Sequence, residues 1–170
     1  RPNGFAQEDV EADWTVCSRD TVGGYTAVGY VFGRSLHKEL AVPVGLIVSS
    51  WGWRRIEPWT PPCGIVGVPE LADIRNTGEA SDPSNLAYQA KLSVYLRGLE
   101  AWLGSAKNAL ETEKSLVPPP TYPVEIQPLT SHQSPTTLYN GMIHPLVPFG
   151  IRGAIWYQGE SNHSEGMLYY

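Results

Sequence analysis

The chain has 170 residues, a formal net charge of −5, and 42% apolar against 17% charged residues. This length suits one domain, which can bury roughly two-thirds of its unfolded surface. Acidic residues outnumber basic ones and the longest basic run is Arg54-Arg55, so we expect neither a nucleic-acid nor an anionic-membrane partner. No apolar run approaches the ~20 residues that span a bilayer.

The first third of the chain predicts the order strand, helix, strand. A short apolar run at 14–17 is a candidate strand, and apolar residues recur at helical spacing over 25–40. Pro43 prevents that helix from continuing. The apolar and β-branched run 43–48 predicts the second strand, which breaks into Ser49-Ser50-Trp51-Gly52.

The remainder predicts an irregular excursion, a long helix and a third strand. Residues 58–84 are punctuated by proline and glycine, so we expect a long loop there. Asp82-Pro83 offers a cap and a first-turn proline for a helix that ends near Glu113 and carries one apolar stripe. A short helix is expected over 137–143, and the apolar run 151–157 predicts a strand.

Polar residues follow two of these predicted strands. Such strand ends meet at the carboxyl edge of a parallel sheet, where open α/β folds bind ligands. Gln158 follows the strand at 151–157, and its amide can donate two hydrogen bonds to an oxyanion. Gly52 follows the other strand, and its N–H can approach a ligand closely. The alternatives are a glutamine that only ties down its loop and a plain turn glycine.

The remaining polar candidates do not make a nucleophile and base pair. Glu57 and Glu160 are the acids nearest these loops. As a pair they can do acid/base work on a sugar, or each can hold its loop through hydrogen bonds to the backbone or to Arg54 or Arg55. Ser161 lies in Gly159-Glu160-Ser161-Asn162-His163, where histidine takes the place of the last glycine of a nucleophile elbow. His144 is expected to be structural, and His37 and His132 to lie at the surface.

No metal or organic cofactor is expected. The sequence has no H-x-x-x-H or C-x-x-C spacing that would indicate a metal site. Its two cysteines, Cys17 and Cys63, form no local pairing motif and are expected to be free thiols, which leaves the redox compartment undetermined. The chain opens without Met and stops on Tyr169-Tyr170, so we expect it to be an internal piece of a longer protein.

Four blocks of the chain resemble the sialate O-acetylesterase family of the SGNH/GDSL-type hydrolases. Residues 25–37 resemble its S-A-V-x-Y-x-F-G-R-x-L-H helix, and residues 42–59 resemble its V-P-V-G-L-I-x-S-S-W-G-G-T-x-I-E-x-W segment. Residues 138–146 resemble L-Y-N-x-M-I-H-P-L, and 156–162 reproduce W-Y-Q-G-E-S-N. Four blocks in order are far more specific than any one alone.

The resemblance implies a three-layer α/β/α fold with a parallel sheet, of the flavodoxin-like SGNH type, here a partial domain over 1–170. It implies a serine esterase that removes acetyl groups from sialic acid or related sugars, and a periplasmic or secreted location. By resemblance, Gly52 and Gln158 donate to the oxyanion while Glu160 and Asn162 orient the loop. The family's nucleophile lies in G-Q-S-N-M and its base in D-x-x-H, and this chain has neither motif.

The chain departs from the family pattern where Gly52-Trp53-Arg54 replaces Gly-Gly-Thr. If the second glycine needs positive φ, Trp53 is strained or narrows the pocket. We expect the acetylated sugar to contact Trp53, Arg54, Glu57 and Asn140. Two alternatives stay open: an acetylxylan-type esterase and a glycan-binding pseudoenzyme without hydrolytic activity.

Overall fold

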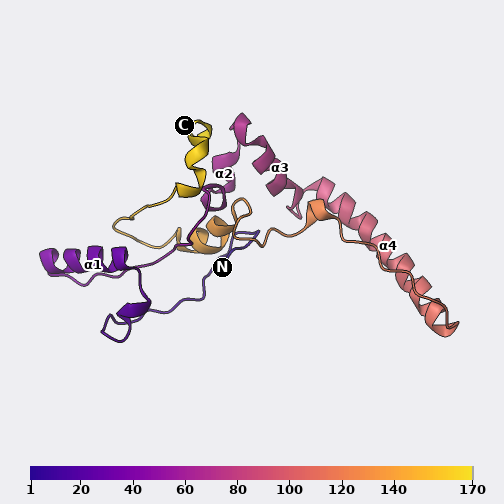
Figure 1. Ribbon diagram of the computed structural model, residues 1–170, viewed down its shortest axis with the longest axis horizontal. Helices are drawn as coiled ribbons and strands as arrows, with labels where there is room; N and C mark the ends of the chain where they lie inside the picture. The colour runs from indigo at the N-terminus through magenta and orange to yellow at the C-terminus, as the bar shows by residue number, and fades with distance from the viewer. Residues whose placement is uncertain (170) are drawn as a thin grey trace. The chain divides into compact units, whose positions relative to one another are not determined.

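The computed structural model describes the backbone of residues 1–169 and the side chains of residues 1–166. This part of the chain folds as two compact units, one formed by Asp9–Gly52 and the other by Arg1–Glu8 with Trp53–Tyr170. Helices and irregular segments make up both units, and no β-strand occurs among the described residues (Figure 1). The predicted three-layer α/β/α fold with a parallel sheet is therefore wrong.

The three predicted strands are apolar segments whose backbones find no neighbouring strand in the described part of the chain. Residues 14–17, 43–48 and 151–157 lie outside the described helices, and they form no β-ladder with any other described segment. A strand is defined by that pairing, so an apolar run alone does not make one. Their side chains also stay largely open to solvent, as Ile155 at 52% and Tyr157 at 88% exposure illustrate.

The unit Asp9–Gly52 is built on helix α1, Ala27–Leu40, which confirms the helix predicted from its spacing. The helix ends where Ala41 turns into the left-handed region with φ 55° and donates its N–H to the carbonyl of His37. The following segment then runs back along the helix, because Leu46 packs on the buried Gly33. A Cβ atom at Gly33 would lie 2.6 Å from Leu46 Cδ1, so any larger residue would push the Leu46 side chain aside. A short 3₁₀ helix, η1 (Val22–Gly24), precedes α1.

The proline-rich segment predicted as an irregular excursion is mostly helical. It contains η2 (Glu57–Trp59), α2 (Pro62–Ile65), η3 (Pro69–Leu71) and α3 (Ala72–Ala80). Each of η2, α2 and η3 has one proline at its first or second position: Pro58, Pro62 and Pro69. Its fixed φ suits a first turn and its missing N–H costs nothing there, so these prolines begin short helices rather than interrupt one.

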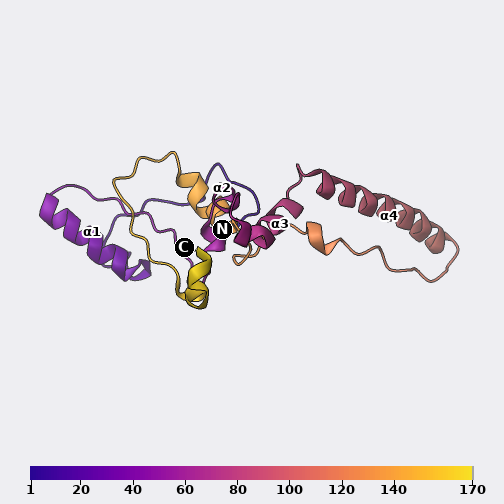
Figure 2. The same ribbon diagram turned by 90° about the horizontal axis from the view of Figure 1, so that it is seen from above.

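Helix α4, Leu86–Glu111, is the long helix that the apolar stripe predicts. Its cap is Asn85, whose Oδ1 accepts the N–H of Ala87 at 2.8 Å, so the predicted start at Asp82-Pro83 is wrong. Asp82 instead accepts the N–H of Ser84 in a turn. The segment after α4 runs back beside it (Figure 2), tied by Trp102 Nε1, which donates to the Val117 carbonyl.

The core of the larger unit is small and lies around η2, α2 and the segment 126–140. Its buried apolar residues include Trp59, Ile65, Leu71, Ile126 and Leu138. A short π-helical turn, η5 (Tyr139–Ile143), confirms the short helix expected there, and η6 (His144–Leu146) follows it. The N-terminal residues Arg1–Glu8 pack on this turn, where Asn3 donates to Thr137 and Gln7 to Asn140. The turn η4 (Val124–Ile126) and the 3₁₀ segment η7 (Glu160–Tyr169) complete the unit.

Candidate functional site

Asn162 joins the two loops that the sequence singles out within the larger unit. Its side chain is buried, at 7% exposure, at the beginning of η7. The Oδ1 atom accepts the backbone N–H of Ile56 at 2.8 Å, while Nδ2 donates to Glu165 Oε2 at 3.1 Å and Glu57 Oε2 at 3.4 Å. The amide therefore uses both of its ends, its oxygen as an acceptor and its nitrogen as a donor.

Arg55 forms the charged part of the same cluster. Its guanidinium donates through Nε and Nη2 to Glu57 Oε1 at 2.8 and 2.6 Å, and through Nη1 and Nη2 to the two oxygens of Glu165 at 2.8 and 2.6 Å. Such forked, charge-assisted pairs fix orientation as well as adding energy. Glu57 is buried and Arg55 supplies its counter-charge, so Glu57 holds its loop, the alternative that the sequence left open.

Glu165 completes this cluster, which we call the Arg55 cluster (Arg55, Glu57, Asn162 and Glu165). The hydrogen bonds from Arg55 and then Asn162 hold the pKa of Glu165 below its usual value of 4.5, against the opposing charge of Glu57. The carboxylate is therefore ionised at neutral pH and pairs with the cation. Sequence reasoning missed Glu165, because nothing in its neighbourhood indicates a partner 110 residues away.

Gln158 is held by one of its two amide N–H groups. Nε2 donates to the backbone carbonyl of Arg54 at 2.7 Å. Within the described residues this side chain makes no other hydrogen bond. The second N–H of Nε2 and the Oε1 atom therefore stay available to a ligand. The bond both ties down the loop and fixes the plane of the amide. The positive φ of 134° at Gly159 turns the chain directly afterwards.

Glu160 and its neighbours lie at the exposed side of the same loop. The Glu160 carboxylate accepts a hydrogen bond from the Tyr157 hydroxyl, which raises the pKa of Tyr157 above its usual value. The Glu160 carbonyl lies 2.7 Å from His163 Nδ1. Both contacts are short-range and lie in the turn around Ser161, and the orienting role of Glu160 stays a prediction.

Trp53 and Arg54 begin the other loop of the site. Trp53 has a φ of 59°, in the left-handed region, and its indole is 89% exposed. The conformation expected of the family's second glycine is therefore adopted here by tryptophan. Arg54 donates through Nη1 to the Trp53 carbonyl at 2.7 Å, whereas its buried Nε has no hydrogen-bond partner.

Asn140 and Gly52 are not members of the Arg55 cluster. Asn140 is 4% exposed and donates to the Gly4 carbonyl and to Thr136 Oγ1, so its amide serves the packing of the N-terminal segment. Gly52 ends the other compact unit. The pairing of Gly52 with Gln158 around one oxyanion therefore stays a prediction, as does a contact between Asn140 and a sugar.

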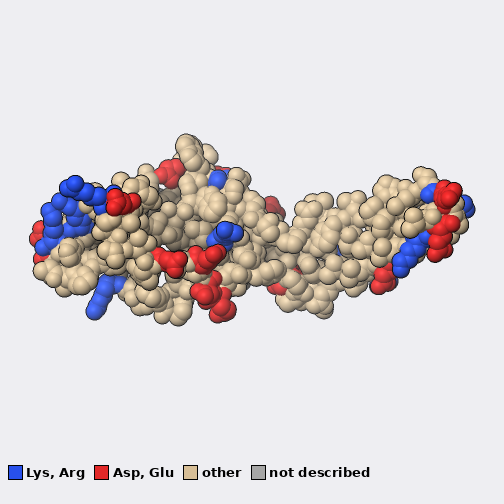
Figure 3. All heavy atoms as spheres, turned by 90° about the horizontal axis from the view of Figure 1, so that it is seen from below, with Lys and Arg blue, Asp and Glu red and all other residues tan. Residues whose placement is uncertain are grey.

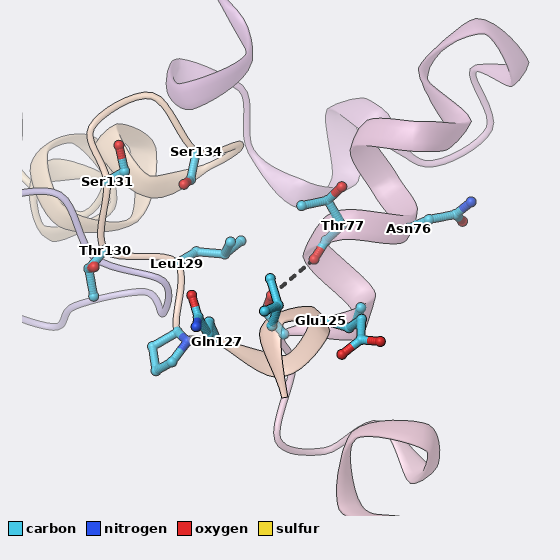
Figure 4. Close-up of a pocket in the computed structure, with 12 residues that line it drawn as sticks. Asn76, Thr77, Glu125, Gln127, Leu129, Thr130, Ser131 and Ser134 are labelled. Atoms are coloured by element: carbon cyan, nitrogen blue, oxygen red, sulfur yellow. Dashed lines mark hydrogen bonds between the residues drawn. The ribbon is translucent and has the colours of Figure 1, made fainter. Parts of the chain in front are cut away.

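A cavity of about 550 Å³ lies elsewhere in the larger unit, between α3 and the segment 124–134. Figure 4 shows Thr77 on α3 across the cavity from Leu129 on that segment. The Ser81 hydroxyl donates to the Thr77 carbonyl at 3.1 Å. Hydroxyl and amide side chains form much of its lining. None of the residues predicted for the site lines this cavity.

Four further observations concern metals, thiols, membranes and His144. Within the described part of the chain, no three His, Cys, Asp or Glu side chains cluster as metal ligands would. Cys17 and Cys63 are free and exposed, as predicted. Among the described helices, none combines the length and apolar character that a membrane span requires. His144 Nδ1 lies 3.0 Å from the Gln7 carbonyl, which agrees with a structural histidine.

The chain is similar in sequence to curated sialate O-acetylesterases. It is 31% identical to "Sialate O-acetylesterase" of Rattus norvegicus over 139 residues, which is 81% of this chain and 21% of that protein. The Mus musculus protein of the same name is 30% identical over 171 residues, covering 91% of this chain and 25% of the relative. The Homo sapiens protein is 29% identical over 160 residues, covering 90% and 21%.

The chain thus spans between a fifth and a quarter of the length of these relatives. No family model matches the chain. No solved structure matches it either. The agreement with the Mus musculus relative covers 91% of this chain. Over the stretch that it shares with these proteins, the similarity of the chain supports a sialate O-acetylesterase-like family.

Proposed function

We propose that this chain supplies the oxyanion-binding loop of a carbohydrate O-acetylesterase that acts on acetylated sialic acid or a related sugar. The observation that carries the proposal is the Gln158 amide, which is held in place by Arg54 and keeps one N–H open. It lies in the W-Y-Q-G-E-S-N segment of a chain similar to proteins named sialate O-acetylesterase.

The proposed chemistry is acyl transfer through a serine. A serine oxygen attacks the acetyl carbonyl, a histidine takes the serine proton, and the sugar hydroxyl leaves with that proton. Water then attacks the acyl-enzyme and releases acetate. Each attack, by serine and then by water, places negative charge on the carbonyl oxygen until the leaving group departs, and the free N–H of Gln158 would stabilise that charge together with the backbone N–H of Gly52. Serine and histidine in these roles are not assigned to any residue of this chain.

The Arg55 cluster supports this proposal because it would keep the donor in place while charge develops. Oxyanion donors act through preorganisation, so a loop that need not move during the reaction stabilises the transition state more. Asn162 and Arg55 join η7 to the backbone of residues 54–57, and Gln158 donates to that same backbone. Trp53 and Arg54 precede this point and would contact the sugar.

The proposal is tested by acetate release from O-acetylated sialic acid, measured on the natural full-length protein. We expect Gln158→Ala to lower kcat by about 10²–10³-fold with KM changed little, as for other single oxyanion donors. The matched control is Gln133→Ala, because Gln133 is an exposed glutamine outside the site. A Gln158→Ala variant that turns over like the parent would remove this residue from the mechanism.

Two further measurements separate the esterase alternatives. Acetate release from acetylated xylan, compared with acetylated sialic acid, identifies the substrate class. Labelling of the 170-residue chain by a fluorophosphonate, followed by peptide mass spectrometry, tests the nucleophile. We expect no labelled serine, and stoichiometric labelling of Ser161 would place the nucleophile in this chain instead.

Glycan binding without hydrolysis is the second candidate, and the exposed indole of Trp53 favours it. An aromatic face open to solvent, at 89% exposure, is suited to stack on a sugar ring. This candidate predicts that the full-length protein binds acetylated sialic acid in calorimetry and releases no acetate. It also predicts that Trp53→Ala weakens this binding, whereas Trp14→Ala, which removes another exposed tryptophan, does not.

A further inference from the structure

Helix α4 carries an apolar strip that the described chain leaves uncovered. Leu96, Leu103 and Leu110 recur every seven residues, and their exposed fractions are 46%, 46% and 82%. Seven residues make nearly two helical turns, so these three side chains lie along one face. We call them the leucine strip. Leu92 and Leu99, which are half-buried, flank it at the same seven-residue spacing.

A neighbouring face of α4 is already occupied by the segment that runs back along the helix. Trp102 donates to the Val117 carbonyl at 2.6 Å, and the rings of Tyr95 and Tyr122 meet edge to face at 5.1 Å. These contacts cover one edge of the apolar stripe and leave the leucine strip beside it. The helix is therefore stabilised from one side only. An exposed row of leucines over two heptads is the surface that a second helix covers in coiled-coil packing.

Charged residues beside the leucine strip indicate what the second helix is. Glu100 and Lys107 lie next to it on the side away from Leu99, seven residues apart and opposite in charge. No ion pair within the described residues engages either of them. Figure 3 shows acidic and basic side chains together at the far end of α4. Along one side of the leucine strip, the helix thus carries an acidic and a basic side chain that could each pair with the opposite charge on a second helix.

A second copy of the same helix satisfies both features when it runs antiparallel and crosses at Leu103. Leu96 then lies opposite the second copy's Leu110, and Leu103 meets its own counterpart on the two-fold axis. Glu100 comes within one residue, about 1.5 Å along the helix, of the second copy's Lys107. The two-fold symmetry also pairs Lys107 with the second copy's Glu100, at the other end of the contact. In a parallel arrangement the flank that carries Glu100 and Lys107 would instead face the flank of the second copy that carries Leu99 and Ala106, so neither charge would gain an oppositely charged partner.

We propose that two copies of this protein associate through an antiparallel contact between their α4 helices, centred on Leu103. The leucine strip supplies the apolar area, and the reciprocal Glu100–Lys107 pairs set the direction. This contact is separate from the Arg55 cluster and from Gln158, so it does not depend on the proposed enzymatic function. Each α4 offers 26 residues, about 39 Å of helix, for it.

Sedimentation equilibrium of the protein over a range of concentrations tests this proposal. We expect a monomer–dimer equilibrium that Leu103→Glu abolishes, because it places two carboxylates together on the two-fold axis. Val94→Glu is the matched control, since Val94 is an exposed apolar residue on the opposite face of α4, and it should leave the dimer intact. A parent chain that stays monomeric up to about 1 mM would overturn the proposal, because no stable contact is that weak.

Charge exchange tests the direction independently of folding. Glu100→Lys should raise the dissociation constant about 10- to 30-fold, because both pairs become repulsive. The double variant Glu100→Lys/Lys107→Glu should return it to within about threefold of the parent. Leu103→Cys, in a Cys17→Ser/Cys63→Ser background, should link to itself on mild oxidation, and Leu110→Cys should not. A double variant as weak as Glu100→Lys, or self-linking at position 110 instead of 103, would refute the antiparallel register.

Discussion

Replacing Asn162 with alanine should loosen the junction between the two loops of the site. The change removes the acceptor of the Ile56 N–H and a donor to Glu165, at 2.8 and 3.1 Å. Each such bond contributes about 1 kcal/mol net, and an N–H left without a partner costs a further 1–3 kcal/mol where water cannot reach it. Because Asn162 is only 7% exposed, we expect a loss of about 2–3 kcal/mol in the free energy of unfolding.

Urea unfolding followed by tryptophan fluorescence measures this loss. Fluorescence is informative here because Trp59 is buried and packs edge to face on Trp156, 6.2 Å away. The control is Asn108→Ala on the exposed surface of α4, which should change the free energy by less than about 0.5 kcal/mol. An Asn162→Ala variant as stable as that control would refute the view that this amide joins the two loops.

The isosteric change Asn162→Asp separates the hydrogen bonds from the charge. Aspartate keeps the acceptor for the Ile56 N–H, but it places a third carboxylate beside Glu57 and Glu165 with Arg55 as the nearby cation. The pKa of the new carboxyl should be raised in the folded state, since like charges disfavour ionisation. Its destabilising effect should therefore be largest at pH 7 and shrink as the pH falls toward 4. Equal destabilisation at both pH values would contradict this reasoning.

Three further changes test other parts of the structure. Trp53→Gly should be about 1 kcal/mol more stable than Trp53→Ala in urea unfolding, because only glycine adopts a φ of 59° without strain; equal stabilities would argue against strain there. Arg55 lowers the pKa of Glu165, so this carboxylate stabilises the fold above pH 4.5 and the contribution is lost as the pH falls through the lowered value. Glu165→Gln should flatten that part of the stability–pH profile, and an unchanged profile would contradict the pairing. Asn85→Ala should lower the unfolding free energy by about 1 kcal/mol and fray the start of α4 in hydrogen exchange, and unchanged exchange there would count against the cap.

The sequence predicted the helices well because their signal is local. Apolar spacing over 25–40 and along the stripe of the long helix identifies α1 and α4, since each helix satisfies its backbone hydrogen bonds within itself. The cap of α4 was misplaced by three residues. Both Asp82 and Asn85 are good caps, and only the geometry shows that Asp82 is engaged in a turn with Ser84.

The predicted sheet failed because a strand needs a partner that its own residues do not specify. The runs 43–48 and 151–157 are apolar, but their backbones pair with no strand in the described part of the chain. Leu46 packs on Gly33 of α1 instead of entering a sheet. An apolar run indicates that side chains need cover, and it does not say what supplies the backbone hydrogen bonds. Likewise the prolines of 58–84 predicted loop, whereas three of them begin short helices.

The two segments predicted to form the site are joined by hydrogen bonds, and this connection depends on a feature that the sequence does not reveal. Three consecutive residues contact the loop that begins at Gln158: the carbonyl of Arg54 accepts from Gln158, the guanidinium of Arg55 binds Glu165, and the N–H of Ile56 donates to Asn162. Two of these contacts use backbone atoms, so almost any residue could stand at those two positions. What the contacts require is a fixed backbone direction at 54–56.

That direction is set one residue earlier, where Trp53 holds a φ of 59°. Because the left-handed conformation turns the chain, it decides where the Arg54 carbonyl points and hence how the Gln158 amide is oriented. A tryptophan in this conformation costs about 1–2 kcal/mol, and the Arg55 and Asn162 contacts that follow can offset that cost. Removing the Arg55 or the Asn162 contact should therefore let Trp53 leave the left-handed region and let the loop move. The orientation of the proposed oxyanion donor then depends on residues that never touch it.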